Sequence, residues 1–242
     1  MKIAVCIQSY NFNKRLCWML SSIFQQKPRK PHLGLPEIIP VVSYVKYTGV
    51  DAVIKAFNDA GYYVNGRCYE NFDRFKYRGL VRNDDVEMID TDWFLFADSD
   101  MVYPPNFFGI LGFFLRTKYK KNEHCLYSQR QSTFFEATEK LLESEGAYPK
   151  IIDNAWEKAS KLKAKLKSNI GAGYCQIANK GAIIRKNNGK YTRTHCDWDW
   201  DKEEMNTKSD IRFRKKMGGE AIPLPIQIHL QHLRCNPHHR SC

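Results

Sequence analysis

The sequence predicts an open α/β fold, in which a mostly parallel sheet is covered by helices on both faces. Short apolar runs alternate with helical patterns through the first half of the chain, as in consecutive βαβ units. The run Trp93-Phe94-Leu95-Phe96-Ala97 is continuously apolar, which is typical of a central parallel strand buried on both faces. With 242 residues, of which 43% are hydrophobic, the chain is long enough for one compact domain with an added segment.

The predicted elements of the first half follow one another with short connections. They are strands over 3–7, 38–45, 62–64 and 92–97, and helices over 14–26, 50–60, 74–89 and 105–118. The first helix carries Leu16, Leu20 and Ile23 on one stripe and ends before Pro28, because proline cannot continue a helix. Gly61 closes the second helix at a position where a left-handed cap is common.

The second half predicts an added helical layer over 133–168, followed by strands over 174–184 and 221–231 with a basic helix at 210–217 between them. In the last strand, the even-numbered residues from 222 to 230 are apolar, and His229 therefore lies on the opposite, polar face. Pro223 and Pro225 remove two backbone donors, so this strand is expected to lie at an edge or to be bulged at its start.

Net charge indicates which class of partner the protein binds, and cysteine content indicates the redox state of its compartment. The net charge of +12 favours anionic partners, and one basic run has no acid within it: Lys158, Lys161, Lys163, Lys165 and Lys167. Such a run is either a solvated face or a contact for an anionic acceptor or a membrane surface. Eight cysteines without a C-x-x-C pair indicate reduced thiols. The sequence has neither a signal-peptide pattern nor a membrane-spanning apolar run, so we expect a cytoplasmic protein.

The strongest chemical signal is Asp98-Ser99-Asp100, at the exit of the predicted central strand. Ligands bind at the carboxyl ends of parallel strands, and two carboxylates there can offer hard oxygens to Mg²⁺ or Mn²⁺. Such a cation in turn binds the oxygens of a diphosphate. The alternative is an Asx-type turn or a helix cap before Pro104.

Two arginines add a second signal. Arg78 and Arg82 are four residues apart and share one face of the predicted helix, where their guanidinium groups could clamp phosphate oxygens. The alternative is a set of surface ion pairs with Asp84, Asp85 or Glu87.

A third signal is Asp210, in the first turn of the predicted basic helix. A carboxylate there either complements the helix dipole or stands as a fixed general base.

Together these segments resemble the family 2 glycosyltransferases, which have the GT-A fold. Gln8-Ser9-Tyr10-Asn11 is similar to the P-T-Y-N turn that contacts the nucleotide in that family. Arg78-Gly79 followed by Val81-Arg82-Asn83 is similar to the family's K-G…A-R-N helix, and residues 93–100 resemble its apolar strand with D-x-D. Near the other end, Ser209-Asp210 with Arg214 and Gly218 resembles the E-D…R…G segment, and residues 226–229 resemble the strand that ends in a metal-ligating histidine.

The resemblance implies an inverting, metal-dependent transferase that uses a nucleoside-diphosphate sugar. It implies a nucleotide site made by Ser9, Tyr10, Asn11, Arg78, Arg82, Asp98 and Ser99. Asp100 and His229, with Asp98, would hold Mn²⁺ or Mg²⁺, and His232 is the alternative ligand if the register of the last strand shifts. Asp210 would be the base that takes the proton of the acceptor hydroxyl.

Departures from the family pattern leave some roles open. The second strand ends Val42-Ser43-Tyr44-Val45-Lys46, where the family carries an acidic turn that contacts the base or ribose. Rival bases for Asp210 are Asp197, Asp199, Asp201, Glu203 and Glu204. Trp198 and Trp200 are candidates to stack on a sugar of the acceptor, or they pack on the body of the protein. Gly173 either lets the backbone approach the donor sugar or lies in a plain turn.

The resemblance also implies an organisation and a set of partners. We expect one domain over 1–232, with a nucleotide-binding half (1–117), a helical insert (118–170) and an acceptor-side half (171–232), and then a tail at 233–242. The expected donor is of the UDP or GDP type, and the acceptor is a glycan, a glycoprotein or a lipid-linked molecule. The alternatives are a retaining transferase of the same fold and a basic nucleic-acid-binding module, although no motif for specific nucleic-acid binding is present.

Overall fold

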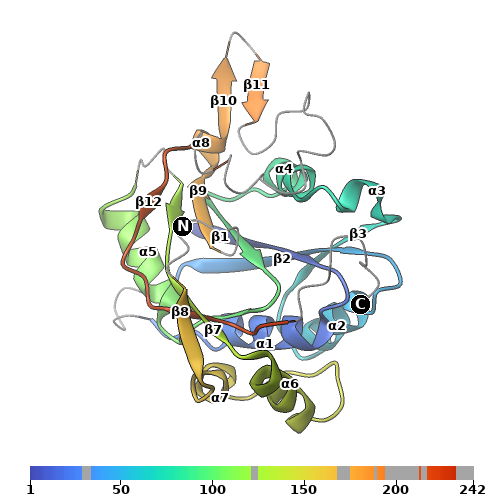
Figure 1. Ribbon diagram of the computed structural model, residues 1–242. Helices are drawn as coiled ribbons and strands as arrows, with labels where there is room; N and C mark the ends of the chain where they lie inside the picture. Colours follow the sequence, from blue (N-terminus) through green and yellow to red (C-terminus); the bar gives the residue numbers. More distant parts are fainter. Residues whose placement is uncertain are drawn as a thin grey trace.

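The computed structural model describes residues 1–28, 34–120, 125–167, 175–187, 190–193, 213 and 217–232 (Figure 1). A seven-stranded sheet forms the centre of the fold. Its strands are β1 (Lys2–Ser9), β2 (Glu37–Val45), β3 (Asn65–Tyr69), β4 (Trp93–Asp98), β6 (Leu126–Tyr127), β9 (Gln176–Asn179) and β12 (Glu220–Ala221). Their order is β12-β6-β9-β4-β1-β2-β3. The strands from β4 to β3 are parallel, and β9 is antiparallel to both of its neighbours. The predicted mostly parallel α/β sheet is therefore confirmed.

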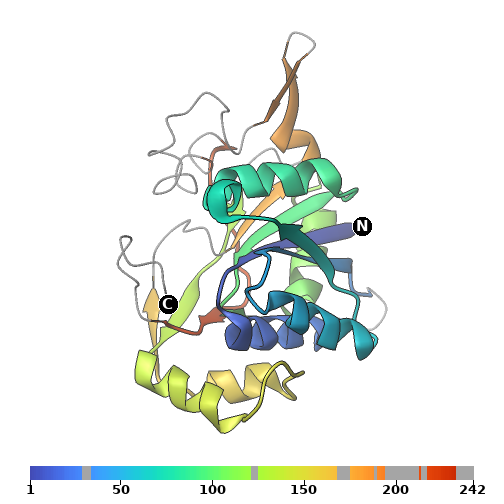
Figure 2. The ribbon, with the colours of Figure 1, turned by 90° about the vertical axis from the view of Figure 1, so that its right-hand side faces the viewer.

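Helices cover both faces of this sheet (Figure 2). On one face lie α1 (Asn13–Phe24), α2 (Val50–Asp59) and α5 (Phe107–Thr117), and on the other lie α3 (Phe72–Phe75), α4 (Arg78–Met88) and α8 (Lys180–Ile183). The alternation of β1 explains this arrangement, because Ile3, Val5 and Ile7 pack into the first core while Ala4 and Cys6 pack into the second. None of the described helices combines the length and the apolar character that crossing a bilayer requires.

A second, four-stranded sheet extends from the end of β4. It consists of β5 (Met101–Val102), β13 (Gln227–His229), β7 (Arg130–Thr133) and β8 (Ala164–Lys167), in the order β5-β13-β7-β8. Beneath it, α6 (Phe135–Ser144) and α7 (Ala155–Ser160) contribute Leu142, Ala155 and Ala159 to the core that also contains α1. Because β5 follows β4 after a two-residue turn, the second sheet begins at the carboxyl end of the central strand. A hairpin of β10 (Ile184–Asn187) and β11 (Lys190–Arg193) completes the described elements.

The segment 118–170 differs from the expected helical insert. It contains α6 and α7, but also β6, β7 and β8. The basic run therefore passes from the end of α7 into a strand. Lys163-Ala164-Lys165-Leu166-Lys167 alternates basic and apolar residues with a period of two, which is the pattern of a strand and not of a helix.

Three further elements differ in their bounds. The third strand is formed by Asn65–Tyr69 and not by the predicted residues 62–64, because it is a polar edge strand without the apolar run that marks a buried one. The predicted helix over 74–89 is divided into α3 and α4. The predicted strand over 221–231 is interrupted between β12 and β13, where Pro223 and Pro225 lie.

The described cysteines Cys6, Cys17, Cys68, Cys125 and Cys175 are free thiols, as the sequence predicts. Burial raises the pKa of Cys6 well above its usual value and that of Cys17 to about 11. A thiol becomes nucleophilic when it ionises, so these two cysteines serve packing and not chemistry.

Candidate functional site

The turn between β4 and β5 places two carboxylates at the centre of the molecule. Asp98 is the last residue of β4, and Ser99 and Asp100 form the turn. In the parallel register of β1 and β4, Gln8 lies beside Asp98, so the exits of the two strands are adjacent. Arg78 of α4 approaches Asp98, with 3.2 Å between Nη1 and Oδ1. The turn thus joins the nucleotide half predicted from the sequence to the second sheet.

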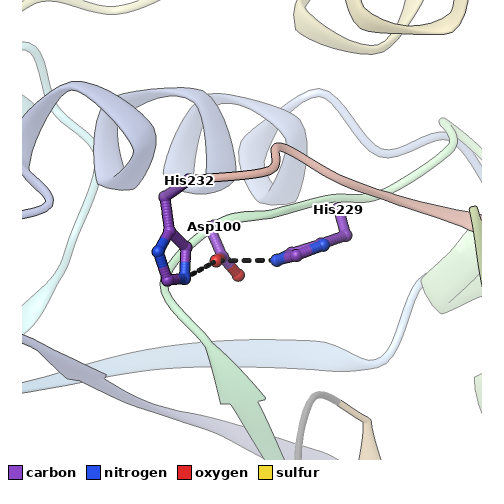
Figure 3. A group of neighbouring side chains, drawn as sticks. All are labelled: Asp100, His229 and His232. Atoms are coloured by element: carbon purple, nitrogen blue, oxygen red, sulfur yellow. Dashed lines mark hydrogen bonds and ion pairs between the residues drawn. The ribbon is translucent and has the colours of Figure 1, made fainter. Parts of the chain in front are cut away.

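Asp100 lies between two histidines from the last described segment (Figure 3). The Nε2 atom of His229 is 3.0 Å from Oδ2 of Asp100, and the Nε2 atom of His232 is 3.6 Å from the same oxygen. One ligand atom from each of the three residues lies within 4.8 Å of the others. The structure therefore brings together Asp100 and His229, as the sequence predicts. His232 joins them, although the sequence analysis gave His232 only as an alternative to His229.

Strand pairing explains why these residues meet. His229 lies opposite Met101 in the antiparallel pair of β13 and β5, and the backbone N–H of Leu230 donates to the carbonyl of Asp100 at 2.9 Å. On the other side of β13, the Ser132 hydroxyl lies 3.1 Å from Nδ1 of His229. A second contact to the ring's other nitrogen fixes its orientation, as is usual for a metal-ligating histidine. Sequence reasoning missed Ser132, since a serine in a short strand carries no signal of its own.

The three residues fit a divalent cation by their chemistry. Asp100 is buried, and its Oδ1 atom has no hydrogen-bond partner among the described residues. An unpartnered buried carboxylate oxygen is costly unless a ligand binds it. Burial raises the pKa of Asp100, but the charge and hydrogen bond of His229 outweigh it, so the pKa lies below its usual range. An ionised carboxylate with two imidazoles suits Mn²⁺ and similar ions.

The exit of β1 holds the residues predicted to contact the nucleotide. Ser9 is fully buried, and its hydroxyl has no hydrogen-bond partner among the described residues. Tyr10 packs against Phe72 of α3, with 4.9 Å between ring centroids, and against Phe75 at 6.3 Å. Asn11 has a positive φ of 59°, an uncommon conformation that turns the chain sharply into α1. These three residues follow the strand that lies beside β4.

The two arginines of α4 occupy different environments. Arg78 is paired with Asp98 at the site. Arg82 is buried, donates from Nη1 to Oε1 of Gln176 at 3.2 Å, and lies over the ring of Phe96. Arg82 therefore lies against the sheet, and among the described contacts only Arg78 reaches the D-x-D turn.

The carboxylates of Asp84 and Asp85 pair with other arginines instead of Arg78 or Arg82. Arg67 of β3 bridges them, with 3.1 Å from Nη2 to Asp84 Oδ2 and 3.1 Å from Nη1 to Asp85 Oδ1. Arg74 of α3 also donates to Asp84, from Nε at 2.9 Å. Both aspartates are buried, so the surface ion pairs considered from the sequence are wrong for this pair of carboxylates. We call Arg67, Arg74, Asp84 and Asp85 the α4 anchor, because they fasten α4 to β3 and α3.

The α4 anchor predicts a pH-dependent stability. Burial raises the pKa of Asp85 to about 7, while Arg67 and the Ser43 hydroxyl partly oppose the shift. Between about pH 4 and 7 the folded protein binds a proton that the unfolded chain has lost, so the free energy of unfolding falls as pH rises through this window, by at most about 4 kcal/mol. We expect thermal unfolding temperatures measured from pH 5 to 8 to show this fall in the wild type, relative to Asp85→Asn.

A surface carboxylate supplies the control for that measurement. Asp59 forms an exposed pair with Lys55 on α2, so Asp59→Asn is expected to leave the pH dependence of the wild type unchanged. Unfolding temperatures that ran parallel in the wild type and in Asp85→Asn would contradict the assignment to Asp85.

Four predicted site residues lie outside the described residues: Asp210, Gly173, Trp198 and Trp200. The rival bases between 197 and 204, the greater part of the predicted basic helix, and the tail at 233–242 also lie outside them. Their roles stay predictions from the sequence.

The architecture around this site is that of the GT-A glycosyltransferases. No family model and no curated protein matches the sequence. Among solved structures, the chain is similar to S. aureus TarS, a GT-A glycosyltransferase of family 2. With residues 1–349 of TarS, the TM-score is 0.59 at 15% identity over 95% of this chain and 60% of that one. The same part of TarS in complex with UDP gives 0.59 at 14% identity, over 94% and 60%. At these identities the likeness establishes the fold, and the chain spans less than two thirds of the TarS chains.

Proposed function

We propose that this protein is a glycosyltransferase, which moves a sugar from a nucleoside-diphosphate sugar to an acceptor hydroxyl with the help of a divalent cation. The observation that carries the proposal is the cluster of Asp100, His229 and His232 at the carboxyl end of β4. In an open α/β sheet this end is where ligands bind. The GT-A fold and the binding of UDP by TarS support the same conclusion.

The donor nucleotide would lie across the exits of β1 and β4. Ser9, Tyr10 and Asn11 lie at the first exit, and Asp98 and Ser99 lie at the second. Of the two arginines of α4, Arg78 already contacts the turn and is placed to bind phosphate oxygens when a donor displaces its pair with Asp98. A donor of the UDP type is favoured by the UDP complex of TarS, with GDP as the alternative.

Asp100, His229 and His232 would hold the cation, Mn²⁺ or Mg²⁺, with Ser132 fixing the ring of His229. When bound, the cation supplies positive charge to neutralise the departing diphosphate.

The acceptor would be activated by Asp210. Its carboxylate takes the proton of the acceptor hydroxyl, the oxygen forms a bond to the anomeric carbon, and the bond from that carbon to the diphosphate oxygen breaks with its electron pair on the diphosphate. Attack from the face opposite the leaving group inverts the configuration. In this proposal, residues 1–117 form the half that binds the donor, and residues 171–232, which include Asp210, form the half that binds the acceptor. Retention of configuration in the product, measured by NMR, would contradict the role of Asp210 as the base.

A thermal-shift panel tests the proposal without knowledge of the acceptor. UDP, GDP, dTDP, CMP and ADP are each added with and without Mn²⁺, because a ligand that binds only the folded state raises the unfolding temperature. We expect one diphosphate, UDP in the first instance, to raise it in a metal-dependent way. No shift with any nucleotide would overturn the proposal.

A pair of matched variants tests whether the metal-dependent shift comes from the proposed cluster. Asp100→Asn removes a proposed ligand, whereas Asp90→Asn alters an exposed carboxylate at the amino end of β4. The metal-dependent part of the shift is expected to disappear in the first variant and to persist in the second.

A further inference from the structure

The lysines of the basic run divide into two groups in the structure. Lys158, on α7, pairs with Glu145 at 2.6 Å, and Lys150 pairs with the same carboxylate at 3.2 Å. Lys161, Lys163 and Lys165 are exposed, and none of them pairs with an acid among the described residues. The first group stabilises the turn between α6 and α7, and the second is available to a ligand.

The strand register connects Lys165 to the metal cluster. Lys165 of β8 lies opposite Ser132 of β7, and Ser132 lies opposite His229 of β13. Residues that face each other across neighbouring strands point to the same side of the sheet. The Ser132 hydroxyl contacts the His229 ring on that side, so Lys165 belongs to the face that carries the metal cluster.

The distance along this face is short. Neighbouring strands lie about 4.8 Å apart, so the backbone of Lys165 is about 10 Å from that of His229. Arg130, two residues before Ser132, is on the same face, and its charge acts on Asp100. Lys163 lies immediately before β8. Positive charge therefore continues from the metal cluster to the edge of the sheet.

The basic residues on this face extend away from the proposed donor site. The strand order β5-β13-β7-β8 begins at β5, which joins the nucleotide half, and ends at β8 on the opposite edge. In Figure 1, β8 lies at the side of the molecule away from α3 and α4. A ligand on Lys163 and Lys165 would thus extend away from the donor while its nearer end reached the metal cluster.

We propose that Lys163 and Lys165 bind the acceptor through negative charges, and that the acceptor of the transferase is an anionic polymer that carries hydroxyl groups. This inference rests on the proposed function. Lysines on edge strands also discourage pairing with other sheets, but that role requires neither a place on the metal-bearing face nor a neighbouring arginine. The net charge of +12 adds a general attraction for such a polymer.

Calorimetric titration with two polyanions, polyphosphate and polygalacturonate, tests this proposal, with neutral dextran as a blank. The variant K163E/K165E is compared with K118E/K120E, which makes the same charge change at exposed lysines at the end of α5. We expect the wild type to bind at least one polyanion and not dextran. K163E/K165E should weaken binding at least about tenfold, and K118E/K120E less than about twofold, at near-physiological salt.

The two polyanions show whether phosphate or carboxylate is preferred, and either preference supports the inference. If both variants weakened polyanion binding equally, the effect would be due to net charge alone, and the inference would be overturned. Stronger binding to vesicles containing phosphatidylglycerol than to either polymer, lost in K163E/K165E, would assign the lysines to a membrane surface and also overturn it. The nucleotide thermal shift should be unchanged in K163E/K165E, so a failure of the proposed function would appear there and a failure of this inference in the titrations.

Discussion

Asp100→Asn is expected to lower kcat/KM for sugar transfer at least about a thousandfold, because positive charge at the leaving diphosphate is lost. Both histidines contact the carboxylate of Asp100, and its Oδ1 atom has no hydrogen-bond partner among the described residues and is left for a ligand. The amide of asparagine keeps the shape of the side chain but not its charge. Initial rates at saturating Mn²⁺ and calorimetric titration with Mn²⁺ alone measure the two consequences separately.

The surroundings of Asp100 predict a graded series. His229→Ala should approach the effect of Asp100→Asn, since His229 lies 3.0 Å from the carboxylate. Ser132→Ala leaves all three ligands in place and only frees the ring of His229, so we expect a loss of about 10–100-fold in metal affinity. Circular dichroism checks that each variant is folded. Unchanged Mn²⁺ affinity in Asp100→Asn would show that the cluster does not hold the metal.

The central sheet was predictable because its signals are local. The continuous apolar runs of β1 and β4 indicate strands that are buried on both faces, and nothing distant is needed to interpret them. The short strands β7 and β8 were missed for the opposite reason. Each has four residues, and they become strands through pairing with β13 and with each other. β7 carries no apolar stripe, and the alternation in β8 covers only two apolar residues, Ala164 and Leu166, which is too short to reveal this pairing.

The candidate site shows the same division between local and distant information. Asp100 and His229 were predicted because each lies at the end of a recognisable strand. That His232 would join His229, and not replace it, depended on the backbone path beyond β13. Arg67 was not singled out at all, because its two partners lie on another element, and a lone arginine in a polar edge strand gives no sign of being buried against two acids.

Arg67→Met is expected to destabilise the fold by about 3 kcal/mol at pH 8, because Asp85, buried without its partner, must either stay charged or bind a proton that is scarce at this pH. Asp85 is only 2% exposed, while Asp84 keeps the guanidinium of Arg74. Methionine retains a long apolar stem, so the loss reflects charge more than volume. For a chain of this size the unfolding temperature should fall by about 6–12 °C.

A double-mutant cycle identifies the charge as the cause. In the Asp85→Asn background no carboxylate is left without a partner, so Arg67→Met should cost about 1 kcal/mol there, a coupling of about 2 kcal/mol. The loss of unfolding free energy in Arg67→Met should also be smaller at pH 6, because a protonated Asp85 carries no charge for the arginine to balance. The pKa of Asp85, about 7, lies between the two pH values compared. Equal penalties in both backgrounds would mean that Arg67 stabilises α4 through packing against Tyr69, over whose ring it lies at 5.1 Å, and not through the aspartates. The predicted coupling would instead show that the α4 anchor holds α4, the helix that carries Arg78, against the sheet through its ion pairs.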